Sequence, residues 1–383
     1  MPNSVRVFQS TDSGAPALSG TAGTLIAVLD ACLTNGYGAV TIDTLVVASN
    51  VATVTDSSGH GFTAIGTVGP VIRIAGATPA GLNGDWRITY VSATQFTFAT
   101  TGISDQTASG TITAKRAPLG FSKLFTGTAN KCAYRSDDVT GTRMYLRVDD
   151  SGTTSARVRG YSAIADQAAL DADTATDPYP TNTQYSGGGY WGKSSAASAT
   201  ARAWRIVGDS RGFMVWVNQS ATVANSIAVY FGDFASEKTA DAYGSVLYCG
   251  VTTTVENMGT LVLINGSTSI YIPRSHTQIG TSIAAVAYTH KIQANYLGGT
   301  GITYPSAVGN QFYAAPVELW ESLTIFRGIL PGIWCPLHPG GGLTDAAIIS
   351  DMAGLSGHSL QIDRCGYAGA AVAISVDISG PWR

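Results

Sequence analysis

The segment whose spacing of reactive residues most suggests chemistry is Gly187-Gly188-Gly189-Tyr190-Trp191-Gly192-Lys193-Ser194, which satisfies the pattern G-x-x-x-x-G-K-[ST]. A working phosphate loop follows a buried strand and opens a helix, so that backbone N–H groups converge on phosphate and the hydroxyl reaches Mg²⁺. The preceding residues, TDPYPTNTQYS, contain two prolines and are mostly polar, which is not typical of a core strand. We therefore expect a glycine-rich surface loop in which Tyr190 and Trp191 pack or make contacts, and no nucleotide cofactor.

Three aspartates, Asp171, Asp173 and Asp177, are spaced as oxygen ligands of a calcium ion are spaced. A calcium loop of the EF-hand type needs a glycine at its sixth position and a glutamate at its twelfth, and LDADTATDP supplies neither. The sequence favours a solvated polar loop, and we expect no metal site.

Paired carboxylates raise the possibility of glycoside hydrolysis, because that reaction uses two acids at a defined separation in space. The pairs that lie close in sequence are Asp137-Asp138, Asp149-Asp150 and Glu318/Glu321. Asp149-Asp150 precede Ser151-Gly152 and fit a hairpin turn equally well. The chain has no short repeat at a fixed period, as a parallel β-helix would. We expect no catalytic residue.

Histidines and cysteines are scattered rather than grouped. There is no H-E-x-x-H, no C-x-x-C, no zinc-ligand spacing and no G-x-S-x-G nucleophile motif. The odd number of cysteines favours buried thiols in a reducing compartment. We expect structural roles for His60, His276, His290, His338 and His358 and for Cys32, Cys132, Cys249, Cys335 and Cys365.

Seven tryptophans and 17 tyrosines could form a sugar-binding platform. Trp86, Trp204 and Trp216 lie in strand patterns and are expected in the core. Tyr185, Tyr190 and Trp191 lie in the loop pattern between Ala172 and Ala201, where exposed amphipathic rings favour interfaces. Subunit contact is favoured over glycan contact.

The clearest element pattern is an all-β module at residues 46–114, with five short strand patterns separated by turn residues. Its expected core residues alternate along these strands, while Arg73, Arg87 and Thr97 face outward. The expected core consists of Ile72, Ile74, Trp86, Ile88, Tyr90, Phe96 and Phe98.

Around this module we expect a helix–strand unit at 1–45, a main antiparallel β-sandwich or barrel body at 115–330, and a Pro/Gly-rich arm with C-terminal strands at 331–383. Leu25, Ile26, Leu29, Cys32 and Leu33 form the apolar stripe of the one short N-terminal helix, which Ser19 or Thr21 could cap and Asn35-Gly36 could end. Body strands are expected at 144–148, 203–207, 213–217, 226–231, 261–264 and 269–272. The arm, Pro331–Leu343, is expected to place Trp334 at a contact within or between subunits.

Composition limits the classes of function. Charged residues make up 12% of the chain, about half the usual share, and the formal net charge is −3 with no basic run. Nucleic-acid binding, which needs a basic surface, is therefore not expected. No apolar stretch approaches the length of a membrane span, so membrane insertion is not expected either. The hydrophobic fraction of 45% supports folding throughout.

Several motifs carry a resemblance to known proteins. The block with HGF, RIAGATP, LNGDWRITYV and QFTFAT before GTITA resembles a small β-sandwich module of immunoglobulin-like type that recurs in virion proteins of tailed bacteriophages. The remainder, from GAPALSGTAGTLIAVLDACLTNGYG through KRAPLGFSKLFTGTANKCAYRS to RGILPGIWCPLH and SGPWR, is similar to a family of tailed-phage structural proteins.

This resemblance implies a non-enzymatic structural component of the tail, neck or capsid surface. Its expected partners are further copies of itself and other virion proteins. It would be held in the host cytoplasm until it enters the virion. The alternative is a receptor- or carbohydrate-binding tail protein, whose partner would be a host surface glycan, and a polysaccharide-degrading tail enzyme is less favoured.

Overall fold

The computed structural model describes residues 4–220, 222, 226–250, 270–288, 302–322, 324–339, 342–350, 352–367 and 370–383. The protein is mainly β, and its named strands all pair antiparallel, which confirms the expected fold class. The named helices are short: α1 (Thr24–Leu29) with its continuation η1 (Asp30–Asn35), η2 (Ala80–Leu82) and α2 (Gln167–Asp171). None of these helices is long and apolar enough to span a membrane.

The expected N-terminal helix is present as α1 and η1. Leu25, Ile26, Leu29, Cys32 and Leu33 are all buried, as their spacing predicts. Gly36 ends the helix with a φ of 71°, a value that favours glycine. The expected capping by Ser19 or Thr21 is wrong, because the N–H groups of the first turn are bound by a distant carboxylate, described below.

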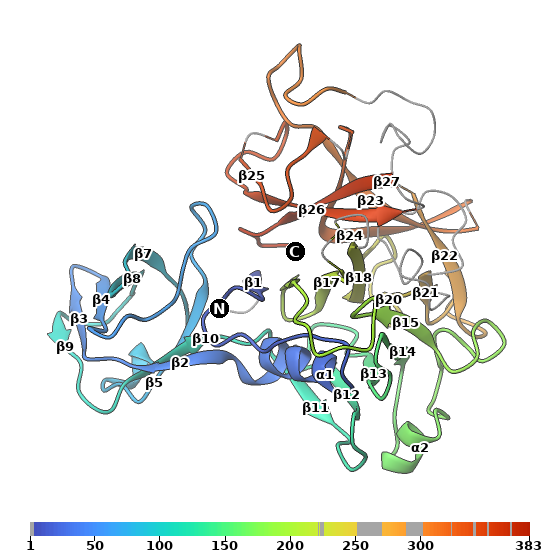
Figure 1. Ribbon diagram of the computed structural model, residues 1–383, viewed down its shortest axis with the longest axis horizontal. Helices are drawn as coiled ribbons and strands as arrows, with labels where there is room; N and C mark the ends of the chain where they lie inside the picture. The colour runs from blue at the N-terminus through green and yellow to red at the C-terminus, as the bar shows by residue number, and fades with distance from the viewer. Residues whose placement is uncertain are drawn as a thin grey trace.

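The inserted module is a sandwich of two sheets with its own core (Figure 1). We call the four-stranded sheet the root sheet, because it contacts the rest of the chain, and the five-stranded sheet the outer sheet. The root sheet has the order β2 (Tyr37–Thr41), β10 (Thr113–Arg116), β5 (Val71–Ala75) and β6 (Gly84–Arg87). The outer sheet has the order β7 (Thr89–Ser92), β8 (Gln95–Ala99), β4 (Val51–Thr55), β3 (Thr44–Ala48) and β9 (Gln106–Thr107).

Two details of the module differ from expectation. A boundary at residues 45/46 would cut β3, and β2 belongs to the root sheet, so the sandwich spans β2 to β10. Tyr90 stands opposite the buried Phe96 but is 41% exposed rather than buried, because β7 is an edge strand of the outer sheet and has a neighbour on one side only. The other expected core residues are buried, with Trp86 partly so.

The body packs a five-stranded sheet, α1 and a long sheet of 13 strands around one large core. Phe121 meets Phe213 edge-on across this core, with 5.5 Å between ring centroids. The five-stranded sheet consists of β11 (Phe121–Leu124), β12 (Lys131–Ser136), β13 (Tyr145–Asp149), β14 (Ser155–Tyr161) and β15 (Gly189–Gly192).

The long sheet runs from the N-terminal strand to the C-terminal strands, which are red in Figure 1. Its order is β1 (Arg6–Gln9), β16 (Trp204–Gly208), β17 (Gly212–Asn218), β18 (Ser226–Asp233), β20 (Ser245–Tyr248), β21 (Ile270–Ile272), β22 (Ile283–Tyr288), β23 (Ala314–Glu321), β24 (Ile325–Pro336), β27 (Ala370–Asp377), β26 (Leu360–Tyr367) and β25 (Ile348–Ile349), with β19 (Ala235–Ser236) beside β24. Five of the six expected body strands coincide with observed strands: four lie in this long sheet, and 144–148 corresponds to β13 of the five-stranded sheet. The sixth, 261–264, lies outside the described residues.

The expected Pro/Gly-rich arm is wrong in its first half. Pro331 to Pro336 continue β24, which pairs with β23 and β27, so the boundary at 330/331 falls inside a strand. Trp334 packs within the chain against the C-terminal cluster around Phe312 and Leu360. Pro331 lies at the register shift between β23 and β24, between the pairs of Ile329 and Trp334, which is a place where a sheet tolerates proline.

Candidate functional site

The lysine of the G-x-x-x-x-G-K-S segment has a structural partner. Lys193 and Asp150 are both fully buried and form an ion pair. The Lys193 ammonium also donates to the carbonyl of Thr21 at 2.8 Å. The second oxygen of Asp150 accepts the N–H groups of Leu25 and Ile26 at 2.8 and 3.2 Å, so the pair caps α1. Lys193 thus joins β15 to the helix.

The glycines of this segment serve packing. Gly188 has a φ of +82°, and a side chain at Gly189 would collide with Sγ of Cys249. The expectation of an exposed loop is wrong for Trp191, which lies in β15, is 1% exposed and donates its indole N–H to the carbonyl of Tyr248 at 2.8 Å. Tyr190 is half-buried beneath the guanidinium of Arg157, 4.1 Å from its ring centre.

Each of the three candidate calcium ligands binds a different partner within the chain. Asp171 accepts a hydrogen bond from Thr128, Asp173 pairs with Arg159 at 2.6 Å, and Asp177 pairs with Arg274 at 2.9 Å. Over the described ranges, no group of three or more histidine, cysteine, aspartate or glutamate side chains is placed to hold a metal ion.

The members of each carboxylate pair also have different partners. Asp137 accepts from Ser122, whereas Asp138 accepts from Thr140 and Ser210. Asp149 lies near Lys131 and Arg147, whereas Asp150 binds Lys193. Glu318 accepts the indole N–H of Trp320, whereas Glu321 contacts Arg327 and His276.

The histidines and thiols have structural surroundings. Nδ1 of His60 accepts the N–H of Phe62 at 2.9 Å, and the ring stacks on Phe62. His338 is buried between the N–H of Tyr313 and the carbonyl of Ile302. All five cysteines are free and buried, as expected, and His290 lies outside the described residues.

Sequence reasoning missed a pocket of about 510 Å³ on the body. It opens between the loop 140–142, the start of β17, the segment from β18 to β20, and Arg383. Its lining combines three cations with hydroxyl groups and small residues: Thr140, Gly141, Thr142, Arg211, Phe234, Ala235, Ser236, Lys238, Thr239, Ala240, Asp241, Ala242, Gly244 and Arg383.

The chain forms this site around a tight turn between β16 and β17. The carboxylate of Asp209 accepts the N–H groups of Arg211 and Gly212 at 2.8 and 3.0 Å, as an aspartate in a turn commonly does. These bonds place a turn at Gly208-Asp209-Ser210, between the strands expected at 203–207 and 213–217. It directs the side chain of Arg211 toward the pocket.

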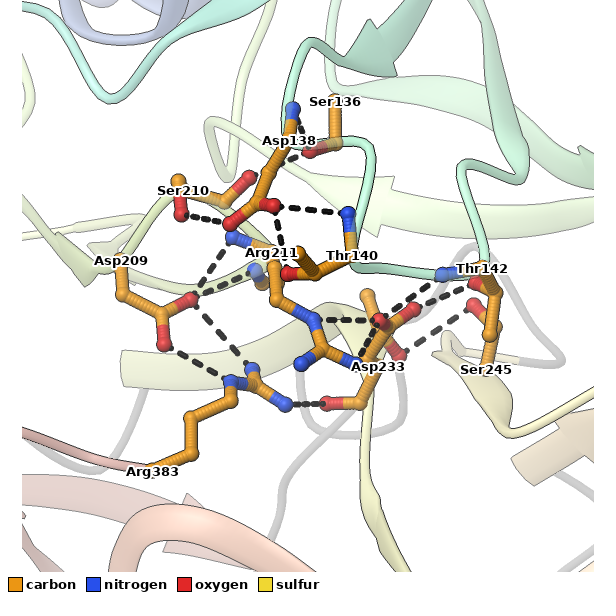
Figure 2. A network of polar contacts seen from close by, with 12 residues as sticks. Ser136, Asp138, Thr140, Thr142, Asp209, Ser210, Arg211, Asp233, Ser245 and Arg383 are labelled. Carbon is orange, nitrogen blue, oxygen red and sulfur yellow. Dashed lines mark hydrogen bonds and ion pairs between the residues drawn. The ribbon is translucent and has the colours of Figure 1, made fainter. Parts of the chain in front are cut away.

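Aspartates hold both pocket arginines, as Figure 2 shows. Arg383 donates from Nε to Asp209 at 2.8 Å and from Nη1 to the carbonyl of Asp233 at 3.2 Å. Arg211 donates from Nε to the carboxylate of Asp233 at 2.9 Å, and Thr142 donates to that same carboxylate from its backbone N–H and its hydroxyl. These bonds fix the two guanidinium planes before any ligand arrives.

The local electrostatics keep the site charged. Burial lowers the pKa of Arg383, but Tyr230 and Asp209 outweigh burial and raise that pKa above its ordinary value. Burial likewise opposes ionisation of Asp138, but hydrogen bonds from Thr140 and Ser210 hold its pKa below the usual range. The lining of the pocket thus includes cationic side chains and hydroxyl-bearing residues, which can form hydrogen bonds with a polar ligand.

The chain matches no protein-family profile and no curated protein sequence. The local sequence signal for this pocket was the turn at Gly208-Asp209-Ser210. No spacing rule links that turn to Asp233 or to Arg383, because the sheet brings them together from distant parts of the chain.

Proposed function

We propose that this protein is a non-enzymatic structural component of a tailed-phage virion, which makes symmetric contacts in the tail, neck or capsid surface. The observation that carries the proposal is the inserted module, a complete two-sheet sandwich that lies to one side of the body (Figure 1). A module with its own core adds a surface without altering the fold that bears it. That arrangement suits a spacer or decoration on a particle.

The bonds between the module and the body favour a fixed rather than a mobile orientation of the module. Arg6 of β1 pairs with Asp85 of β6 at 2.9 Å, and Arg87 donates to the carbonyl of Val5 at 2.6 Å. At the other end of the root sheet, Asp12 binds Arg116 at 2.7 Å in a buried ion pair and accepts the hydroxyl of Tyr37 at 2.7 Å. Bonds at both ends fix the orientation of the sandwich.

The outer sheet supports subunit contact, since none of its five strands contains a charged residue. One cross-strand row runs through Thr89, Thr97, Thr53, Val46 and Thr107. Removing a charge from water is the most costly part of burying a polar surface. A neighbour could cover this face without that cost, because its strands carry no charge. Threonine hydroxyls both donate and accept, so copies of the face are compatible with one another.

Under this proposal the partners are further copies of the chain and other virion proteins, and the protein moves from the host cytoplasm into the particle. The contacts of Lys193 and Asp150 support a non-enzymatic role for the G-x-x-x-x-G-K-S segment, because these groups bind each other and the start of α1. The pocket beside Arg211 and Arg383 favours a receptor-binding tail protein as the second candidate.

The test is the protein composition of purified particles of the phage that encodes the chain, measured by mass spectrometry with and without an amber mutation in its gene. We expect peptides of the chain in a fixed ratio to the other virion proteins, and incomplete or non-infectious particles from the amber mutant. Particles that lack the chain and stay fully infectious would overturn the proposal.

A further inference from the structure

We propose that the pocket beside Arg211 and Arg383 is a binding site for a small anion that carries a carboxylate or phosphate group. This inference does not depend on the virion role. The first reason is the sign of the groups that line the pocket. Arg211, Arg383 and Lys238 all face it, whereas the aspartates that hold the arginines, Asp209 and Asp233, are absent from its lining.

The second reason is the hydrogen-bonding capacity that remains on the arginines. Arg211 uses Nε and Nη2 for the carboxylate of Asp233, at 2.9 and 2.8 Å. Among the residues that the structure describes, its Nη1 group has no hydrogen-bond partner. Because a guanidinium carries five N–H donors in a plane, Arg211 keeps donors for an oxyanion. Arg211 and Arg383 are 25% and 13% exposed, so their remaining donors reach the pocket.

The third reason is that the pocket's carboxylate is already bound. Asp241 is 2% exposed, lies 3.3 Å from Arg327 and accepts the hydroxyl of Ser236 at 2.8 Å. It therefore adds little repulsion at the mouth. A volume of about 510 Å³ lies within the range of small-ligand sites, and the polar residues Thr239 and Ser236 are part of its lining.

Calorimetric titration of the full chain at low salt tests the proposal, with three probes: inorganic phosphate, glucuronate and the uncharged sugar glucose. We expect saturable binding of phosphate or glucuronate and none of glucose. Binding of phosphate alone would assign the site to phosphorylated ligands, and binding of glucuronate alone would assign it to acidic sugars. Absence of binding by both anions, or equal binding of glucose, would overturn the proposal.

Variants locate the binding. Arg211→Gln is expected to weaken the anion by about tenfold or more, because it removes a charge-assisted contact. Thr239→Glu leaves the arginine network intact and is expected to weaken binding through repulsion, which covers the case in which Arg211→Gln fails to fold. The matched control is Arg73→Gln, which breaks a comparable pair with Asp85 in the module and should leave binding unchanged. Unaltered binding in both pocket variants would contradict the assignment.

Discussion

At the scale of single residues, charge in this protein is sparse and much of it is buried in pairs. Lys193 with Asp150, Arg116 with Asp12 and Arg205 with Asp363 each join segments far apart in the sequence. Burying such a pair costs desolvation that the attraction only partly offsets, but removing one partner leaves a buried, uncompensated charge. These pairs therefore specify which segments meet.

The Lys193–Asp150 pair gives the first prediction. Lys193→Met should lower the free energy of unfolding by about 3–5 kcal/mol, because Asp150 would stay buried beside α1 without its cation. Chemical denaturation measures this loss. The exposed Lys238→Met is the control, with a change within about 0.5 kcal/mol.

The double variant Asp150→Asn with Lys193→Met should recover part of that loss, since it leaves no unpaired charge. An effect of Lys193→Met no larger than that of the control would contradict the structural role. So would saturable binding of Mg-ATP that the variant loses.

The second prediction concerns pH. Asp363 is fully buried, and one of its oxygens lies 2.5 Å from Nε of Arg205. The two Nη groups of Arg205 donate to Asp345 at 3.1 and 2.8 Å. The guanidinium of Arg205 also stacks on the ring of Trp216. Burial raises the pKa of Asp363 to about 6. Because this pKa lies above that of the unfolded chain, the stability contributed by Asp363 is complete below about pH 4 and is lost as the pH rises through 6.

The loss amounts to about 3 kcal/mol, from the difference of about two pKa units. Asp363→Asn does not titrate, so the stability of this variant relative to the natural protein should improve by that amount between about pH 4 and pH 7. Unfolding curves at several pH values measure the difference. Parallel pH profiles for the two proteins would show that the folded-state pKa of Asp363 is not raised.

At the scale of elements, the root of the module determines where it can be separated from the body. A side chain on Gly36 would meet the carbonyl of Arg116, so the entry and exit of the module are adjacent. Leu119 and Gly120 then donate to the carbonyls of Cys32 and Leu33 at 2.9 and 3.0 Å, which returns the chain to the end of the helix. The body is therefore continuous across the insertion.

The third prediction follows from this geometry. Replacing residues 37–116 by a Gly-Ser link should leave a folded body, and residues 37–116 alone should unfold cooperatively on heating, as followed by circular dichroism. Deleting only 46–114 is the comparison. It should give a less stable body, because β2 and the start of β3 would remain without their partners. An unfolded module together with an insoluble body would contradict the independence of the sandwich.

The sequence predicts elements better than it predicts contacts between them. The alternation around Ile72, Trp86 and Phe96 identified the module core, and the spacing from Leu25 to Leu33 identified the helix. The cap of that helix could not be predicted, because Asp150 reaches it from another part of the chain. The pocket of Arg211 and Arg383 could not be predicted for the same reason. The pattern at Pro331 predicted an arm because proline usually ends a strand, whereas a register shift between β23 and β24 accommodates it here.

At the scale of the whole molecule, charge is distributed unevenly. The root sheet carries Arg73, Asp85, Arg87 and Arg116, which bind within the module and to the body, whereas the strands of the outer sheet carry none. The hydroxyl and small apolar side chains left on that face are solvated less strongly than charges. Closed symmetric association is a common way to cover such a surface.

The most direct test of the proposed virion role is an electron cryo-microscopy map of the intact particle to which the chain is proposed to belong. We expect several symmetry-related copies of this fold in the tail, neck or capsid surface, with the outer sheet against a neighbouring protein. A map in which every ordered protein is assigned and this fold is absent would rule out the virion role. A single isolated copy whose outer sheet contacts no neighbour would rule out the proposed subunit contact.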